Sequence, residues 1–186
     1  NSIRDLVDKK VAEYSSRPAF HCMGKTITFG ELDGMTRKFG AWLQSKGYGK
    51  GARVALMMPN CLQYPVALYG TLRAGGIVVN VNPLYTAREL EHQLKDSGAE
   101  VIVILENFAS TLEEVLSKTP VKHIIVASLG DMLGVKGMIV NFVVRNVKKM
   151  VPAFGLPAAT RFNDVLSEAA GLELKPVAVG HEDIAF

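Results

Sequence analysis

The stretch over residues 72–90 most constrains the fold, because it reads as a helix end, a buried strand, a turn and a new helix. Gly75 and Gly76 follow a helical pattern, and glycine readily adopts the left-handed conformation in which many helices end. Residues 77–81 then form a short apolar run that is rich in β-branched side chains. Such a run is typical of a strand that is covered on both faces.

The second half of this stretch predicts a turn and another helix. Asn82 precedes Pro83, and a residue before proline is disfavoured in the helical conformation. Thr86 and Glu89 have the spacing of a capping box, in which each side chain satisfies a backbone N–H of the other residue. We therefore expect a helix to begin at Ala87.

The same alternation extends over residues 51–130. Asn60 is expected to cap the first helix of this region. Strands are predicted over residues 53–58, 77–81, 100–105 and 121–127, and helices over residues 60–72, 87–96 and 108–117. Strands that alternate with helices imply right-handed crossovers and a mainly parallel sheet. The predicted fold class is therefore α/β, with a doubly wound, mainly parallel sheet and flanking helices.

Residues 1–50 predict a helix, a hairpin and a second helix. Ser2 and Asp5 have capping-box spacing, as do Thr28 and Glu31. Two short strand patterns, over residues 18–22 and 25–29, are separated by a Met-Gly pair and indicate a hairpin.

Residues 131–180 predict a basic amphipathic helix followed by a linker. The segment from Met132 to Asn163 contains five basic residues and no acidic one. On a helix that ends before Pro152, apolar side chains fall within an arc of about 140°. The members of this arc are Ile139, Val140, Val143, Val144, Val147, Met150 and Val151.

Three cations, Arg145, Lys148 and Lys149, fall on the opposite side of that helix and are the candidate membrane-surface residues. Such a helix could rest on anionic lipid. It could equally be an ordinary surface helix, with its apolar arc packed on the sheet and its basic face in water. The sequence alone is compatible with both interpretations of this helix. Residues 181–186 look like the start of a truncated strand, so we expect the chain to be an incomplete part of a larger N-terminal domain.

Composition excludes several classes of function. Hydrophobic residues make up 48% of the chain, which is typical of a globular protein rather than a disordered one. A net charge of +3 is too small to indicate a nucleic-acid binder, and the basic segment lacks interleaved aromatic side chains. Cys22 and Cys61 are the only cysteines, and we expect both to be reduced thiols.

Long unbroken runs of this sequence resemble one enzyme family. Residues 72–99, LRAGGIVVNVNPLYTARELEHQLKDSGA, are similar to the second core motif of the acyl-adenylate-forming enzymes. The likeness is greater still to bacterial long-chain fatty acid–CoA ligases, which residues 57–60 and 63–70 also resemble. The resemblance extends over nearly the whole chain.

This resemblance implies an AMP-forming ligase that joins a long-chain fatty acid to ATP and passes the acyl group to coenzyme A. It also implies that the Thr- and Gly-rich phosphate-binding loop, the catalytic residues and the Mg²⁺ and ATP sites lie beyond Phe186. We therefore assign no catalytic, cofactor-binding or metal-binding residue to this chain, which alone should be inactive. Asn80 and Asn82, at a predicted strand end, are the candidates for ligand contact. A purely structural role for Asn82, bonding its own turn, is the alternative.

Two other readings remain. One is an acyl-adenylate-forming enzyme that acts on a short or aromatic acid. The other is a non-catalytic α/β module that binds a membrane or a partner. For the ligase we expect a cytoplasmic protein, in peripheral contact with the inner face of the cell membrane, that forms homodimers and binds no nucleic acid.

Overall fold

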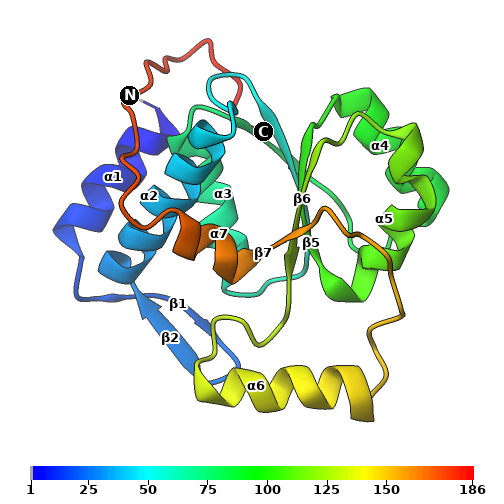
Figure 1. Cartoon of the computed structure of the whole chain (residues 1–186). Coiled ribbons are helices and arrows are strands. Elements are labelled where there is room, and N and C mark those ends of the chain that lie inside the picture. Colours follow the sequence, from blue (N-terminus) through cyan, green and yellow to red (C-terminus); the bar gives the residue numbers. More distant parts are fainter. Residues whose placement is uncertain (1) are drawn as a thin grey trace. The chain divides into compact units, whose positions relative to one another are not determined.

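The computed structural model describes residues 2–186, which divide into two compact units (Figure 1). Unit 1 comprises the residues up to Ala52 together with Asn60–Val78 and Val165–Phe186. Unit 2 comprises Arg53–Pro59 and Val79–Asp164. The chain therefore passes repeatedly between the units.

Unit 1 is built from helices and one hairpin. Its helices are α1 (Ile3–Glu13), α2 (Phe29–Ser45) and α3 (Gln63–Arg73), and its hairpin strands are β1 (Pro18–Cys22) and β2 (Lys25–Thr28). The predicted hairpin and the capping boxes that begin α1 and α2 are confirmed. Helix α2 packs against both α1 and α3, and its side chains Phe39 and Trp42 are fully buried (Figure 1).

The predicted start of α3 is wrong. The helix begins at Gln63, after Leu62, and not at Asn60. Asn60 lies in the preceding loop, where its carbonyl accepts a hydrogen bond from the Cys22 thiol at 3.8 Å. The other end of α3 is as expected, because Gly75 takes a left-handed conformation with φ of +85° directly after the helix.

The sheet has five strands in the order β4-β3-β5-β6-β7. The pairs β3–β5, β5–β6 and β6–β7 are parallel, which confirms the predicted fold class. The strands are β3 (Arg53–Met57), β4 (Ile77–Asn80), β5 (Val101–Leu105), β6 (His123–Ala127) and β7 (Thr160–Arg161). The two-residue β7 was not predicted, since it is too short to show a strand period.

Two helices of unit 2, α4 (Ala87–Ser97) and α5 (Ala109–Val115), cover one face of this sheet (Figure 1). Leu90, Leu94 and Leu112 pack there against Ile102 and Ile104 of β5. The predicted Thr86–Glu89 capping box begins α4, and Gly98 in a left-handed conformation ends it. Short helical turns, η1 (Glu106–Phe108) and η2 (Leu116–Lys118), flank α5.

The segment that follows β6 contains α6 (Val135–Phe142), the π-helical stretch η3 (Val143–Val147) and then α7 (Phe162–Glu168). Near the end of the chain, the Ala185 carbonyl accepts a hydrogen bond from the Val78 N–H of β4 at 2.9 Å. This contact places Ala185 beside β4. Residues 181–186, which were expected to begin a strand, have turn and irregular structure. Across residues 2–186, no helix has the length and apolar character needed to cross a membrane.

Candidate functional site

A buried polar cluster lies at the carboxyl edge of the sheet in unit 2. Glu106 directly follows β5, Ser128 directly follows β6, and Arg161 is the last residue of β7. Because parallel strands bring their carboxyl ends to one edge, these three residues meet there. The side chain of Glu106 is only 2% exposed, so its charge requires partners within the protein.

Arg145, from η3, is the main partner of Glu106. Its Nε atom donates to Oε1 at 3.0 Å, and its Nη2 atom donates to Oε2 at 2.8 Å. Nη2 also donates to the Ser128 hydroxyl at 2.8 Å, and Arg161 Nη1 reaches Oε2 at 3.4 Å. Hydrogen bonding to the Glu106 carboxylate raises the pKa of Arg145 above its ordinary value. Such two-point guanidinium–carboxylate pairs fix geometry as well as charge.

The loop after β6 joins this cluster to α6. Asp131 Oδ2 accepts from the Ser128 N–H at 2.7 Å, and Asn141 Oδ1 accepts from the Gly130 N–H at 2.7 Å. Burial raises the pKa of Asp131 and outweighs the hydrogen bonds that it accepts from Ser128 and Asn141. Since these polar groups bond to one another, the cluster is suited to hold α6 and η3 on the sheet rather than to bind a substrate.

The candidate membrane-surface residues therefore have different surroundings. Arg145 is engaged by Glu106, whereas Lys148 and Lys149 are exposed. Lys149 has a φ of +50°, a left-handed conformation that ends the helical segment before Pro152.

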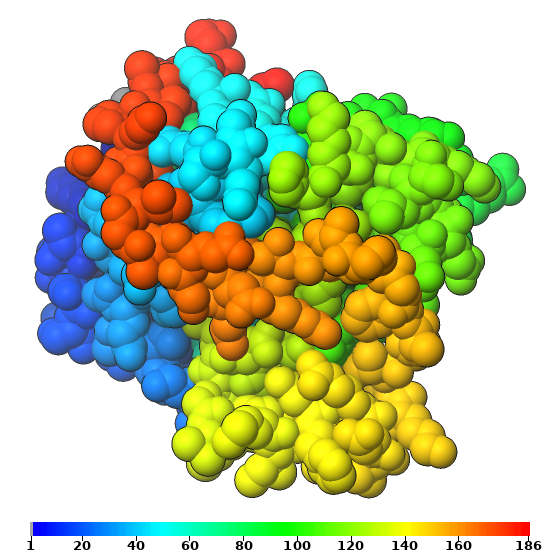
Figure 2. Space-filling view, viewed as in Figure 1, coloured from blue at the N-terminus to red at the C-terminus, as the bar shows by residue number. Residues whose placement is uncertain are grey.

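Only part of the apolar arc packs inward. Val144 is buried, but Ile139, Val147 and Met150 are exposed. Figure 2 shows the segment, in yellow, at the surface of unit 2. The inward positions of α6 are instead Gly137, whose lack of a side chain allows contact with the Gly130 backbone, and the half-buried Asn141.

The wide helical turn accounts for the positions of Val147 and Met150. Lys148 N–H bonds to the Val143 carbonyl at 2.8 Å, five residues back, and Met150 N–H bonds to the Val144 carbonyl at 3.0 Å. A π-helical turn holds more residues than an α-helical one. The angular positions expected for an α-helix therefore do not apply after Phe142.

Asn82 has the structural role that was considered for it. Its Oδ1 atom accepts from the Leu84 N–H at 3.0 Å, so it closes the turn that follows β4. Asn80 is exposed, and its carbonyl accepts from Gln93 Nε2 at 2.9 Å.

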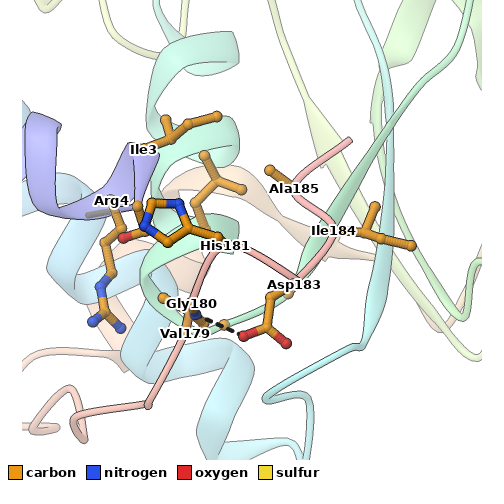
Figure 3. A pocket seen from close by; sticks show the side chains of 12 residues that line it. Ile3, Arg4, Val179, Gly180, His181, Asp183, Ile184 and Ala185 are labelled. Atoms are coloured by element: carbon orange, nitrogen blue, oxygen red, sulfur yellow. Dashed lines mark hydrogen bonds between the residues drawn. The ribbon is translucent and has the colours of Figure 1, made fainter.

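Unit 1 has a cavity between the start of α1, the end of α3 and the last residues of the chain (Figure 3). Arg4, His181 and Asp183 contribute its polar groups, and Asp183 Oδ2 accepts from the Gly180 N–H at 2.8 Å. Its volume of about 220 Å³ is below the roughly 300–1,000 Å³ of ligand pockets. Arg4 is already committed to the Val177 carbonyl at 2.6 Å.

A buried cation, Arg73, was not predicted. Its side chain is 2% exposed and pairs with Asp8 of α1 at 2.5 Å and with Asp33 of α2 at 2.6 Å. It also donates to the Thr36 hydroxyl. Arg73 thereby joins α1, α2 and α3. A basic residue in the last turn of a helix gives little sign of such a role, because most such residues lie in water.

The polar groups around the parallel α/β sheet make structural contacts, so this part of the protein is a scaffold. The class of this scaffold follows from its similarity to known proteins. The profile of the AMP-binding enzyme family matches residues 7–183, and the chain belongs to this family. It is 53% identical over its full length to a long-chain-fatty-acid–CoA ligase of Escherichia coli. It is also 53% identical to one of Haemophilus influenzae.

The chain spans about a third of the length of these curated relatives, since it covers 33% of each. Among solved structures, a benzoate CoA ligase from Burkholderia xenovorans has a TM-score of 0.75 and 22% identity. The match covers 98% of this chain and 31% of that one. At this identity the likeness establishes the fold alone.

Proposed function

We propose that the protein to which this chain belongs is an AMP-forming long-chain fatty acid–CoA ligase. The observation that carries this proposal is the 53% identity, sustained over the full chain, to bacterial ligases of that name. In the proposed reaction a fatty acid carboxylate attacks the α-phosphorus of ATP, and pyrophosphate leaves. The coenzyme A thiolate then attacks the acyl carbonyl, and AMP leaves.

We place the Mg²⁺ and ATP sites of this reaction outside residues 2–186. Within that range, no three His, Cys, Asp or Glu side chains gather where they could hold a metal ion. Glu106, the buried carboxylate at the sheet edge, has both oxygens occupied by arginines and does not fit a Mg²⁺ ligand. The part proposed for this chain is to supply the sheet on which the nucleotide-binding segments assemble.

We further propose a cytoplasmic protein in peripheral contact with the inner face of the membrane, where fatty acids partition. The exposed apolar side chains of α6 and η3 support this contact. A homodimer is proposed from the family resemblance, and light scattering of the protein made from its complete reading frame tests it. A measured molar mass equal to that of a single chain would contradict the dimer and would leave the proposed reaction unaffected.

Pyrophosphate release tests the ligase proposal. The protein from the complete reading frame is incubated with ATP, Mg²⁺, coenzyme A and acids of several chain lengths, including benzoate. We expect release with long-chain acids and none from residues 1–186 alone. If pyrophosphate is released only with benzoate or short acids, the substrate is a short or aromatic acid and not a long-chain fatty acid. No release with any acid would favour a binding module instead.

A further inference from the structure

Exposed apolar side chains of the described residues cluster on α6 and η3. Six of the thirteen large hydrophobic side chains that are exposed among residues 2–186 fall within this short segment. We call them the α6 apolar face: Val135 (77% exposed), Met138 (69%), Ile139 (65%), Phe142 (60%), Val147 (62%) and Met150 (58%). Clustering on this scale marks an interaction surface rather than scattered surface residues.

Inward-facing polar contacts keep this face turned outward. Arg145 is paired with Glu106, Asn141 accepts from the Gly130 N–H, and Gly137 abuts the Gly130 backbone. If the helix rolled to bury the α6 apolar face, Glu106 would lose its main partner while remaining buried. The outward orientation is therefore a fixed feature of unit 2.

The charges beside the face indicate what it contacts. The segment from Met132 to Asn163 contains five cations and no acidic residue. Two of these cations, Arg145 and Arg161, form ion pairs with Glu106. The other three, Lys136, Lys148 and Lys149, are exposed and have no ion-pair partner within residues 2–186.

This combination disfavours a second copy of the chain as the partner. Two such faces in contact would bring six lysines together and repel. An anionic lipid surface instead accepts apolar side chains below its headgroups and lysines among them.

We propose that the α6 apolar face inserts into anionic phospholipid, with Lys136, Lys148 and Lys149 on the headgroups. The inference rests on the membrane contact proposed above and assigns that contact to the α6 apolar face. It also reverses the expectation from sequence, in which Arg145 faced the lipid. Apolar insertion supplies the attachment, lysines select anionic lipid, and Arg145, through its ion pair with Glu106, holds the helix on the sheet.

Vesicle sedimentation tests this assignment on the protein from the complete reading frame. The vesicles contain phosphatidylcholine alone or with phosphatidylglycerol. We expect Met138→Glu/Phe142→Glu to weaken binding to the anionic vesicles at least tenfold. Leu84→Glu is the matched control, because Leu84 is 81% exposed but lies outside the segment, and it should bind like the unaltered protein. Replacing Lys136, Lys148 and Lys149 by Gln should remove the preference for anionic vesicles.

Quenching of tryptophan fluorescence is a second, independent measurement, so the test does not depend on the yield of any one variant. Trp42, the only tryptophan of residues 1–186, is 1% exposed, and the quenching of each variant is measured as its difference from the unaltered protein. A Phe142→Trp variant should be quenched by brominated lipid, and a Leu84→Trp variant should not. Unchanged sedimentation of the Glu variant, or no quenching at position 142, would overturn the proposal. Pyrophosphate release with a detergent-dispersed acid should persist in every variant, which separates this failure from that of the ligase assignment.

Discussion

Arg145 of η3 and Glu106 at the end of β5 form a two-point ion pair, although they lie 39 positions apart in the chain. The pair joins a surface helix to the buried edge of the sheet. It uses the cation that the sequence pattern places on the outer, basic side of the helix. A polar contact, rather than apolar packing, therefore determines which side of α6 and η3 meets water.

Replacing Arg145 tests the strength of this contact. We expect Arg145→Met to lower the free energy of unfolding by about 2–3 kcal/mol, because Glu106 would remain buried with a weaker set of partners. The loss should be below that for a fully enclosed pair, since Arg145 is 42% exposed and Arg161 still contacts Glu106. Urea unfolding measures it.

Lys148→Met is the control for this change, because Lys148 is exposed on the same segment. It should alter stability by no more than about 0.5 kcal/mol. The double variant Glu106→Gln/Arg145→Met should lose less than the sum of its single changes. Additive losses would mean that the two side chains do not interact in solution.

Close contact at Gly137 supports a second prediction. A Cβ atom at this position would collide with the Gly130 carbonyl, so Gly137→Ala should cost about 1–3 kcal/mol of stability. Gly34→Ala in α2 is the matched control, since open space surrounds that glycine, and it should stabilise by about 0.5–1 kcal/mol. Thermal unfolding compares them. A stabilising Gly137→Ala would show that α6 does not sit against Gly130.

The ion pairs of Asp33 predict a pH dependence. Burial alone would raise the pKa of Asp33, but hydrogen bonds from Arg37 and Arg73 outweigh it and hold the pKa below its ordinary value. A carboxyl with a depressed folded-state pKa stabilises the fold above its unfolded pKa of about 3.9. This contribution is lost as the pH falls through the folded-state pKa.

Asp33→Asn should therefore be less stable than the unaltered protein at pH 7, by about 1–3 kcal/mol. The difference in stability should narrow as the pH falls below the unfolded-state pKa of about 3.9 and vanish once Asp33 is protonated in the folded protein. Glu173→Gln, at an exposed position, should follow the unaltered protein throughout. A stability gap for Asp33→Asn that stays constant from pH 7 to pH 3 would exclude a role for the Asp33 charge. Urea unfolding at several pH values makes the comparison.

Local signals account for most of what the sequence predicts correctly. The capping pairs Ser2–Asp5 and Thr86–Glu89, and the left-handed Gly98, act within one helical turn, so their spacing alone reveals them. The parallel sheet follows from alternation of strand and helix patterns. Asn60 shows the limit of such signals. The loop continues past Asn60, and α3 begins at Gln63 without a side-chain cap.

Long-range contacts account for what the sequence does not predict. Arg73 meets Asp8 across 65 positions, and no local spacing indicates that they will pair. The orientation of α6 cannot be predicted for a related reason. Its apolar arc fits either packing on the sheet or contact with lipid, and the partner of Arg145 is a glutamate that looks like an ordinary charged residue after a strand.

The two thiols should differ sharply in reactivity. Burial raises the pKa of Cys61 to about 11, whereas Cys22 is half-buried in β1. At pH 8 only about one Cys61 in a thousand would be a thiolate, the form that reacts with a disulfide reagent. Of these two thiols only Cys22 should react fast in the native protein, so Cys22→Ser should remove one fast-reacting thiol while Cys61→Ser removes none. Both thiols should react after unfolding in urea, which controls for oxidation during preparation. Loss of the fast phase in Cys61→Ser would mean that Cys61 is accessible and that the loop before α3 opens in solution.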